Sequence, residues 1–130
     1  MSAAEQVGLT VTHRRYVSYA DAHYGGHLVD GAFVLGLFGD VATELCIRTD
    51  GDEGLFASYT DVQFVAPVRA GDVVEVTATL VAVGRRSRAV QFTAHVVCRS
   101  APHRSASASD VIAEPILAAK AAGTVVVPGA

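Results

Sequence analysis

The stretch from Asp21 to Leu45, DAHYGGHLVDGAFVLGLFGDVATEL, decides the fold. A polar, glycine-rich loop runs directly into a segment that is apolar nearly all round, which is the pattern of a helix buried in a protein core. Asp40 and Glu44 interrupt this segment four residues apart, so they lie on the same helix face. We therefore expect a central helix from Gly31 with one polar seam.

The composition fits one domain. The chain has 130 residues and is 51% hydrophobic, which is enough for one core and too little for two domains. We treat residues 1–130 as one unit, with residues 1–8 frayed and residues 101–110 forming a mobile loop. A formal charge of -3 and the lack of a broad basic patch argue against a nucleic-acid partner.

Membrane insertion and secretion also lack support in the sequence. The chain shows no secretion signal, and residues 31–45 are too short and too interrupted by Asp40 to cross a bilayer. Cys46 and Cys98 have neither metal-ligand nor redox-pair spacing, as expected of buried thiols in a reducing compartment. We expect a cytoplasmic protein without a membrane partner.

Several segments alternate with the period of two that is typical of half-buried strands. Residues Leu9–Ser18 predict a first strand, and Leu55–Val65 predict one or two short strands after the helix. Val74–Ala82 and Val90–Cys98 form a long hairpin across the turn at Gly84 to Ser87. Ile112–Val127 supply the closing strand, with an edge or bulge at Pro115.

This order of elements predicts an α+β fold in which a long central helix is wrapped by a curved antiparallel sheet, a single hotdog domain. Such a sheet leaves an edge strand and one side of the helix open. We therefore expect at least a homodimer, or a higher homo-oligomer.

The start of the helix is the first candidate site. A glycine-rich turn at a helix N-terminus presents free backbone N–H groups, which suit a developing oxyanion. Gly31 and Ala32 occupy that position and are candidates for binding a thioester carbonyl oxygen. The alternative is an ordinary N-cap, in which Asp30 accepts the N–H bonds of the first turn.

The polar seam is the second candidate site. Like charges four residues apart in a partly dry site raise at least one pKa, which prepares a general acid or base, so Asp40 and Glu44 are candidates. Equally, Glu44 could pair with Arg48, and Asp40 could bond a strand backbone. His23 and His27 are candidate proton carriers. No third ligand stands at suitable spacing, so we expect no metal.

The turn of the hairpin carries a compact cationic cluster. Arg85, Arg86 and Arg88 surround Ser87, and such a cluster suits the phosphates of coenzyme A (CoA). A solvated turn would have the same composition. The glycine patterns of nucleotide-redox enzymes and kinases are missing from the sequence.

The segment DAHYGGHLVDGAFVLGLFGDVATELCIRTDGDEGLFASYTDVQFVAPVRAGD, with VAVGRRSRAVQFTA after it, closely resembles the 3-aminobutyryl-CoA ammonia-lyases and, less closely, β-alanyl-CoA ammonia-lyase. The resemblance covers most of the chain. It implies a hotdog enzyme without a metal or prosthetic group that reversibly eliminates ammonia from a 3-aminoacyl-CoA to give the 2-enoyl-CoA. The partners implied are an acyl-CoA thioester and ammonia.

On that reading the thioester oxygen binds at Gly31 and Ala32 while a carboxylate removes the α-proton. We take Glu44 as first choice for the base, Asp40 as holding the ammonium and His23 as relaying protons. Which of these and Asp30 carries the proton stays open.

Two rival functions are weighed beside the lyase. The runner-up is an acyl-CoA thioesterase, although Phe38 stands where many hotdog thioesterases place a helix carboxylate; Asp21 could serve as their loop aspartate instead. A non-catalytic acyl-CoA-binding protein is the third hypothesis. The acyl chain length stays open, because four residues could line the pocket or only lie beside it: Phe33, Leu37, Phe38 and Tyr59.

Overall fold

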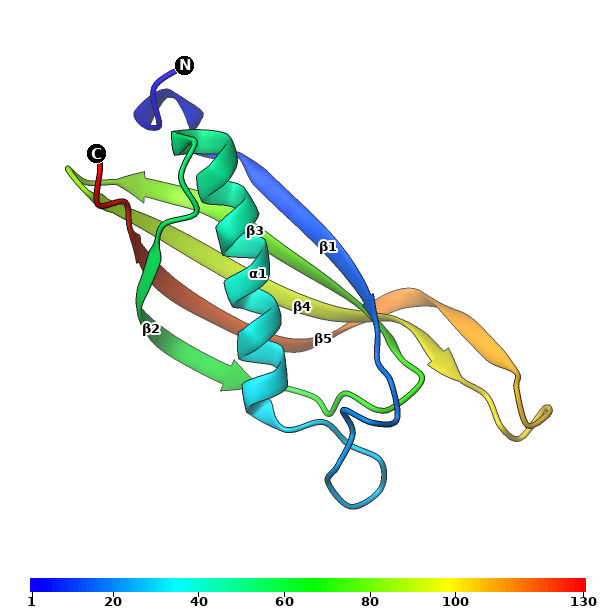
Figure 1. Ribbon diagram of the computed structural model, residues 1–130. Helices are drawn as coiled ribbons and strands as arrows, with labels where there is room; N and C mark the ends of the chain where they lie inside the picture. Colours follow the sequence, from blue (N-terminus) through cyan, green and yellow to red (C-terminus); the bar gives the residue numbers. More distant parts are fainter.

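The computed structural model describes residues 1–130 and consists of one long helix across one face of a five-stranded sheet (Figure 1). The elements are a 3₁₀-helix η1 (Ala4–Gln6), β1 (Thr10–Tyr16), α1 (Gly31–Asp50), β2 (Leu55–Phe64), β3 (Val73–Val83), β4 (Ser87–Ser100) and β5 (Ser109–Val126). The strand order β1-β3-β4-β5-β2 makes β1 and β2 the edges, and every neighbouring pair is antiparallel. The predicted hotdog arrangement is confirmed.

The long hairpin of β3 and β4 forms the middle of the sheet. Its residues alternate as predicted: Val76 and Ala78 are buried against the helix, and they pair with Ala94 and Phe92 on β4. The opposite face of β3 carries half-buried polar residues such as Thr77. Because the period is two, this register places the buried apolar side chains of the hairpin on the face that α1 covers.

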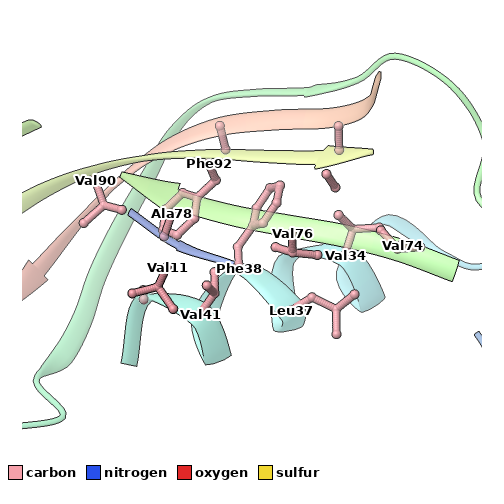
Figure 2. Packing of buried hydrophobic residues seen from close by; sticks show 14 of the residues in the cluster. Val11, Val34, Leu37, Phe38, Val41, Val74, Val76, Ala78, Val90 and Phe92 are labelled. Atoms are coloured by element: carbon pink, nitrogen blue, oxygen red, sulfur yellow. The ribbon is translucent and has the colours of Figure 1, made fainter. Parts of the chain in front are cut away.

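Helix α1 is held by its apolar stripe. Phe38 is fully buried and stacks on Phe92 of β4, with ring centroids 5.0 Å apart, at the centre of the core drawn in Figure 2. The helix ends at Asp50, and the next residue, Gly51, has a φ of 66° that allows its N–H to donate to the carbonyl of Ile47 at 2.9 Å. A left-handed glycine is a common end for a helix.

Two peripheral segments differ from the sequence expectation. Residues 4–6 form η1, and the Gln6 side chain reaches the carbonyl of Thr49 at 3.4 Å, so this part of the terminus is tied to α1. The sheet pairing also continues to Ser100 and Ser109, which leaves only residues 101–108 between the strands. The expected irregularity near Pro115 is confirmed, because the partners of Val96 and Cys98 on β5 are five residues apart.

The free edge at β2 has large exposed apolar residues at both of its ends. Leu55 at its start is 64% exposed and Phe64 at its end is 56% exposed. Proteins usually cover or pair such an edge. No helix combines the length and apolar character of a membrane span.

Candidate active site

The N-terminus of α1 is open. Asp30 occupies the N-cap position in an extended conformation, but its carboxylate accepts no hydrogen bond from the first turn. The N–H groups of a first helical turn have no intrahelical partner, so those of Gly31 and Ala32 remain available to a ligand. The structure therefore contradicts the alternative in which Asp30 is an ordinary cap and leaves its carboxylate free for another role.

A histidine lies against that carboxylate. His23 Nε2 is 3.6 Å from Asp30 Oδ1, and the two side chains are 61% and 27% exposed. The ring of His23 also makes an edge contact with Tyr24, with centroids 4.9 Å apart. A partly buried carboxylate joined to a solvent-exposed imidazole can take up a proton and pass it to water.

An apolar pocket opens beside the same turn. It has a volume of about 260 Å³, and Asp30 is the single charged residue among those that line it. The lining residues are Val29, Asp30, Gly31, Val34, Phe64, Ala66, Pro67, Val68, Ala118 and Ala119. A small apolar pocket with one convergent charged group is the usual form of a small-molecule site.

Phe64 forms one wall of this pocket and fixes the identity of Gly31. A Cβ atom added at Gly31 would lie 2.6 Å from Cζ of Phe64, closer than side chains normally approach. Only glycine therefore allows the ring to stand over the first residue of α1. Sequence patterns gave no signal for this contact, because Phe64 and Gly31 lie more than thirty residues apart.

The loops that shape the pocket are fastened by a buried ion pair. Asp72 is fully buried and accepts two bonds from Arg99, which also donates to the carbonyl of Pro67 at 3.1 Å. The carbonyl of the adjacent Val68 accepts the N–H of Val29 at 3.0 Å, which ties this segment to the loop before α1. Sequence patterns did not indicate Arg99 as the partner of Asp72.

Glu44 lies far from this turn. It is thirteen residues beyond Gly31, which corresponds to about 20 Å along a helix axis. One oxygen contacts His13 Nε2 at 2.9 Å, and the other accepts a bond from Arg48 at 2.8 Å. The bond from Arg48, followed by that to His13, lowers the pKa of Glu44. Within one protomer Glu44 therefore does not face a thioester bound at Gly31, and the alternative pairing with Arg48 is confirmed.

Asp40 is also removed from the open turn. It is exposed and lies nine residues past Gly31, about 14 Å along the axis. Its charge acts on Tyr59, whose pKa is raised first by burial and then by Asp40. The Tyr59 hydroxyl donates to the carbonyl of Leu35 at 2.6 Å, so it anchors β2 to α1 and does not line the pocket.

The other candidate pocket residues occupy different places. Phe38 and Leu37 are buried in the core, and Phe33 packs beside it under the guanidinium of Arg15. Of the helix residues after Gly31, only Val34 lines the pocket. The apolar periodicity of the helix did not indicate which of its apolar side chains line a pocket and which pack in the core.

The arginine cluster is divided by the fold. Arg88 is buried and forms a bidentate pair with Asp50, at 2.7 and 2.9 Å, and it also donates to the carbonyls of Gly84 and Ser87. These bonds raise the pKa of Arg88 and lower that of Asp50. Arg88 is therefore a structural residue here, contrary to its expected place in an exposed phosphate site.

Arg85 and Arg86 remain exposed, with half-buried Ser87 beside them. Because Arg88 joins this turn to Asp50, the last residue of α1, the turn lies at the opposite end of the helix from Gly31 (Figure 1). The twenty residues of α1 correspond to about 30 Å. Within one protomer these two arginines do not face the open turn.

Two further loop residues have local partners. Asp21 accepts a hydrogen bond from the Ser18 hydroxyl at 3.0 Å, which closes the local turn. His27 has a φ of 58° and makes an edge contact with the ring of Tyr19. No three His, Cys, Asp or Glu side chains converge as metal ligands would.

Comparisons with known proteins agree with this arrangement. The model of the thioesterase superfamily matches residues 26–97. The chain is 53% identical over 112 residues to the 3-aminobutyryl-CoA ammonia lyase of Acetoanaerobium sticklandii, covering 86% of this chain and 89% of that protein.

Solved structures show the same likeness. The β-alanyl-CoA:ammonia lyase from Clostridium propionicum superposes with a TM-score of 0.88 at 35% identity, covering 94% of this chain and 87% of that one. A hexameric hotdog thioesterase of Campylobacter jejuni gives a TM-score of 0.72 at 18% identity, covering 88% and 79%, a likeness of fold alone.

Proposed function

The chain belongs to the thioesterase superfamily and, within it, to the family of the 3-aminobutyryl-CoA ammonia-lyases, and we propose that it reversibly eliminates ammonia from a short 3-aminoacyl-CoA. The product is the 2-enoyl-CoA. The observation that carries the proposal is the uncapped N-terminus of α1, with Asp30 and His23 beside a small apolar pocket.

The reaction uses this geometry in three steps. The thioester carbonyl oxygen accepts the N–H groups of Gly31 and Ala32, and donors of that kind stabilise the enolate by about 3 to 4 kcal/mol each. The Asp30 carboxylate removes the proton from the carbon next to the carbonyl. The enolate then re-forms the carbonyl, the new double bond forms between the α and β carbons, and the C–N bond breaks to release ammonia.

His23 completes the proton path. Its imidazole lies 3.6 Å from Asp30 and is largely exposed, so it can receive the abstracted proton and release it to water. The negative charge of Asp30 also favours an ammonium substituent over a hydroxyl group. This assignment moves the base from Glu44 to Asp30 and replaces Asp40 as the group that attracts the ammonium.

We propose that the reaction needs no metal or prosthetic group, because enolate stabilisation comes from backbone donors. We further propose a homo-oligomer in the cytoplasm. The exposed apolar edge of β2 supports self-association, and two cysteines without a disulfide partner suit a reducing compartment. If Arg85 and Arg86 bind CoA phosphates, they serve the site of another protomer.

One assay tests the function. The pure protein is incubated with crotonyl-CoA and ammonium after treatment with a chelator, and the enoyl absorbance is followed beside a thiol reagent. Loss of absorbance that requires ammonium and occurs without thiol release identifies ammonia addition. Thiol release would instead identify the thioesterase that the superfamily match makes the second candidate, and no change would indicate a binding protein.

A further inference from the structure

We propose that Phe64 determines the length of the acyl chain that the pocket accepts. The inference rests on the proposed acyl-CoA substrate and specifies its size. Phe64 is the last residue of β2, which ends beside the first turn of α1 (Figure 1). Its ring is therefore placed where the acyl chain of the substrate must extend beyond the reacting carbons.

The ring is held over Gly31 by direct contact. Three atoms at its tip lie within 3.0 Å of the position that a Gly31 Cβ would take. Phe64 is also 56% exposed and takes no part in the aromatic cluster of Phe56, Tyr59 and Phe92. A large apolar side chain that is half exposed and pressed on a glycine adds little to the core, so its position calls for another explanation.

The rest of the pocket lining explains why this one side chain matters. Phe64 is the single aromatic residue among the ten, and Ala66, Ala118 and Ala119 contribute only methyl groups. The volume of about 260 Å³ lies below the range of roughly 300 to 1,000 Å³ usual for larger ligands. Removing the ring is thus the single truncation that extends this space most.

The chain contains a matched control. Phe56, near the other end of β2, contacts Gly123 in the same way: a Cβ at Gly123 would lie 2.7 Å from Cζ of Phe56. Phe56 does not line the pocket beside Gly31. Phe56→Ala therefore removes a ring from the same strand and from a similar glycine contact without altering the proposed acyl site.

The test measures binding first, without turnover. The unaltered protein, Phe64→Ala, Phe64→Leu and Phe56→Ala are titrated calorimetrically with butyryl-CoA, hexanoyl-CoA and octanoyl-CoA. Each extra methylene in an apolar pocket changes discrimination by about 10-fold or more. We expect Phe64→Ala to improve octanoyl-CoA affinity relative to butyryl-CoA by at least about 10-fold, Phe64→Leu to lie between, and Phe56→Ala to keep the unaltered ratio.

An unchanged ratio in the folded Phe64 variants, or an equal change in Phe56→Ala, overturns the proposal. Failure to bind any of the three thioesters overturns it too. Ammonia addition to crotonyl-CoA is measured separately on the unaltered protein. If the unaltered protein does not add ammonia to crotonyl-CoA, but the Phe64 variants show the expected shift in chain-length preference, the proposed reaction is refuted and the role of Phe64 is still supported.

Discussion

His23 Nε2 and Asp30 Oδ1 lie 3.6 Å apart at the entrance to α1, brought together by a loop that folds back on itself. The turn is held by the Tyr24 N–H bond to the carbonyl of Leu28 at 3.0 Å. The short distance between His23 and Asp30 therefore depends on the conformation of the whole loop between them. It is also the one contact between two candidate catalytic side chains that the structure forms beside the open helix N-terminus.

Asp30→Asn should abolish most of the activity and spare the fold. Loss of a general base typically costs 10²- to 10⁴-fold in rate, so we expect kcat/KM for ammonia addition to crotonyl-CoA to fall by about that much. The carboxylate caps nothing, and Asp30→Asn keeps the shape of the side chain, so we expect stability to change by about 0.5 kcal/mol or less. Steady-state kinetics and urea unfolding measure both, and a fully active Asp30→Asn protein would disprove the assignment.

Glu44→Gln should keep the activity and change the stability. Because Glu44 lies about 20 Å from Gly31 along α1, we expect ammonia addition to remain close to that of the unaltered protein. Its bonds to Arg48 and His13 lower its pKa in the folded state, so they stabilise the protein above the unfolded pKa and are lost as pH falls through the folded value. The Tm difference between the two proteins should be largest near neutral pH and vanish in strong acid. Inactive Glu44→Gln would return the base to Glu44, reached from another protomer.

The fold could be predicted from the sequence more fully than the candidate site. Periodicity identified α1, the β3–β4 hairpin and the glycine turn, because each depends on residues close in the chain. The contact of Phe64 with Gly31 and the pair of Asp72 with Arg99 depend on strand order, which local patterns do not encode. Helical spacing placed Glu44 and Asp40 on one face, and it already puts them about 20 and 14 Å from Gly31 along the axis. The bond of Glu44 to His13 on β1 could not be read from that spacing.

Breaking the pair of Arg88 and Asp50 should destabilise the protein strongly. The two side chains are only 5% and 10% exposed, so Asp50→Asn leaves a buried guanidinium without its counter-charge, at a cost of about 3 to 5 kcal/mol. The lowered pKa of Asp50 means that this stabilisation is present above the unfolded pKa and disappears in acid. Urea unfolding at pH 7 measures the loss. Arg85→Ala, at an exposed position of the same turn, is the control and should leave stability unchanged.

Only one of the two cysteines should react with a thiol reagent in the folded protein. Burial raises the pKa of Cys46 to about 11, so its thiol stays protonated near pH 8, and the side chain is inaccessible. Cys98 is half-buried. Ellman titration at pH 8 should give at most one thiol per chain in buffer and two in denaturant. Two rapid thiols in buffer would contradict the buried environment of Cys46.

Gly31→Ala and Phe64→Ala should be coupled. The added methyl group would meet the Phe64 ring at 2.6 Å, and overpacking of this kind costs about 1 to 3 kcal/mol. In the Phe64→Ala background the space is open, so the same substitution should cost less, because alanine is a better helix former than glycine. Urea unfolding of the four proteins gives the coupling energy directly. Additive effects would mean that the ring moves aside freely, and the wall that Phe64 forms over the helix N-terminus would then be too soft to select a substrate.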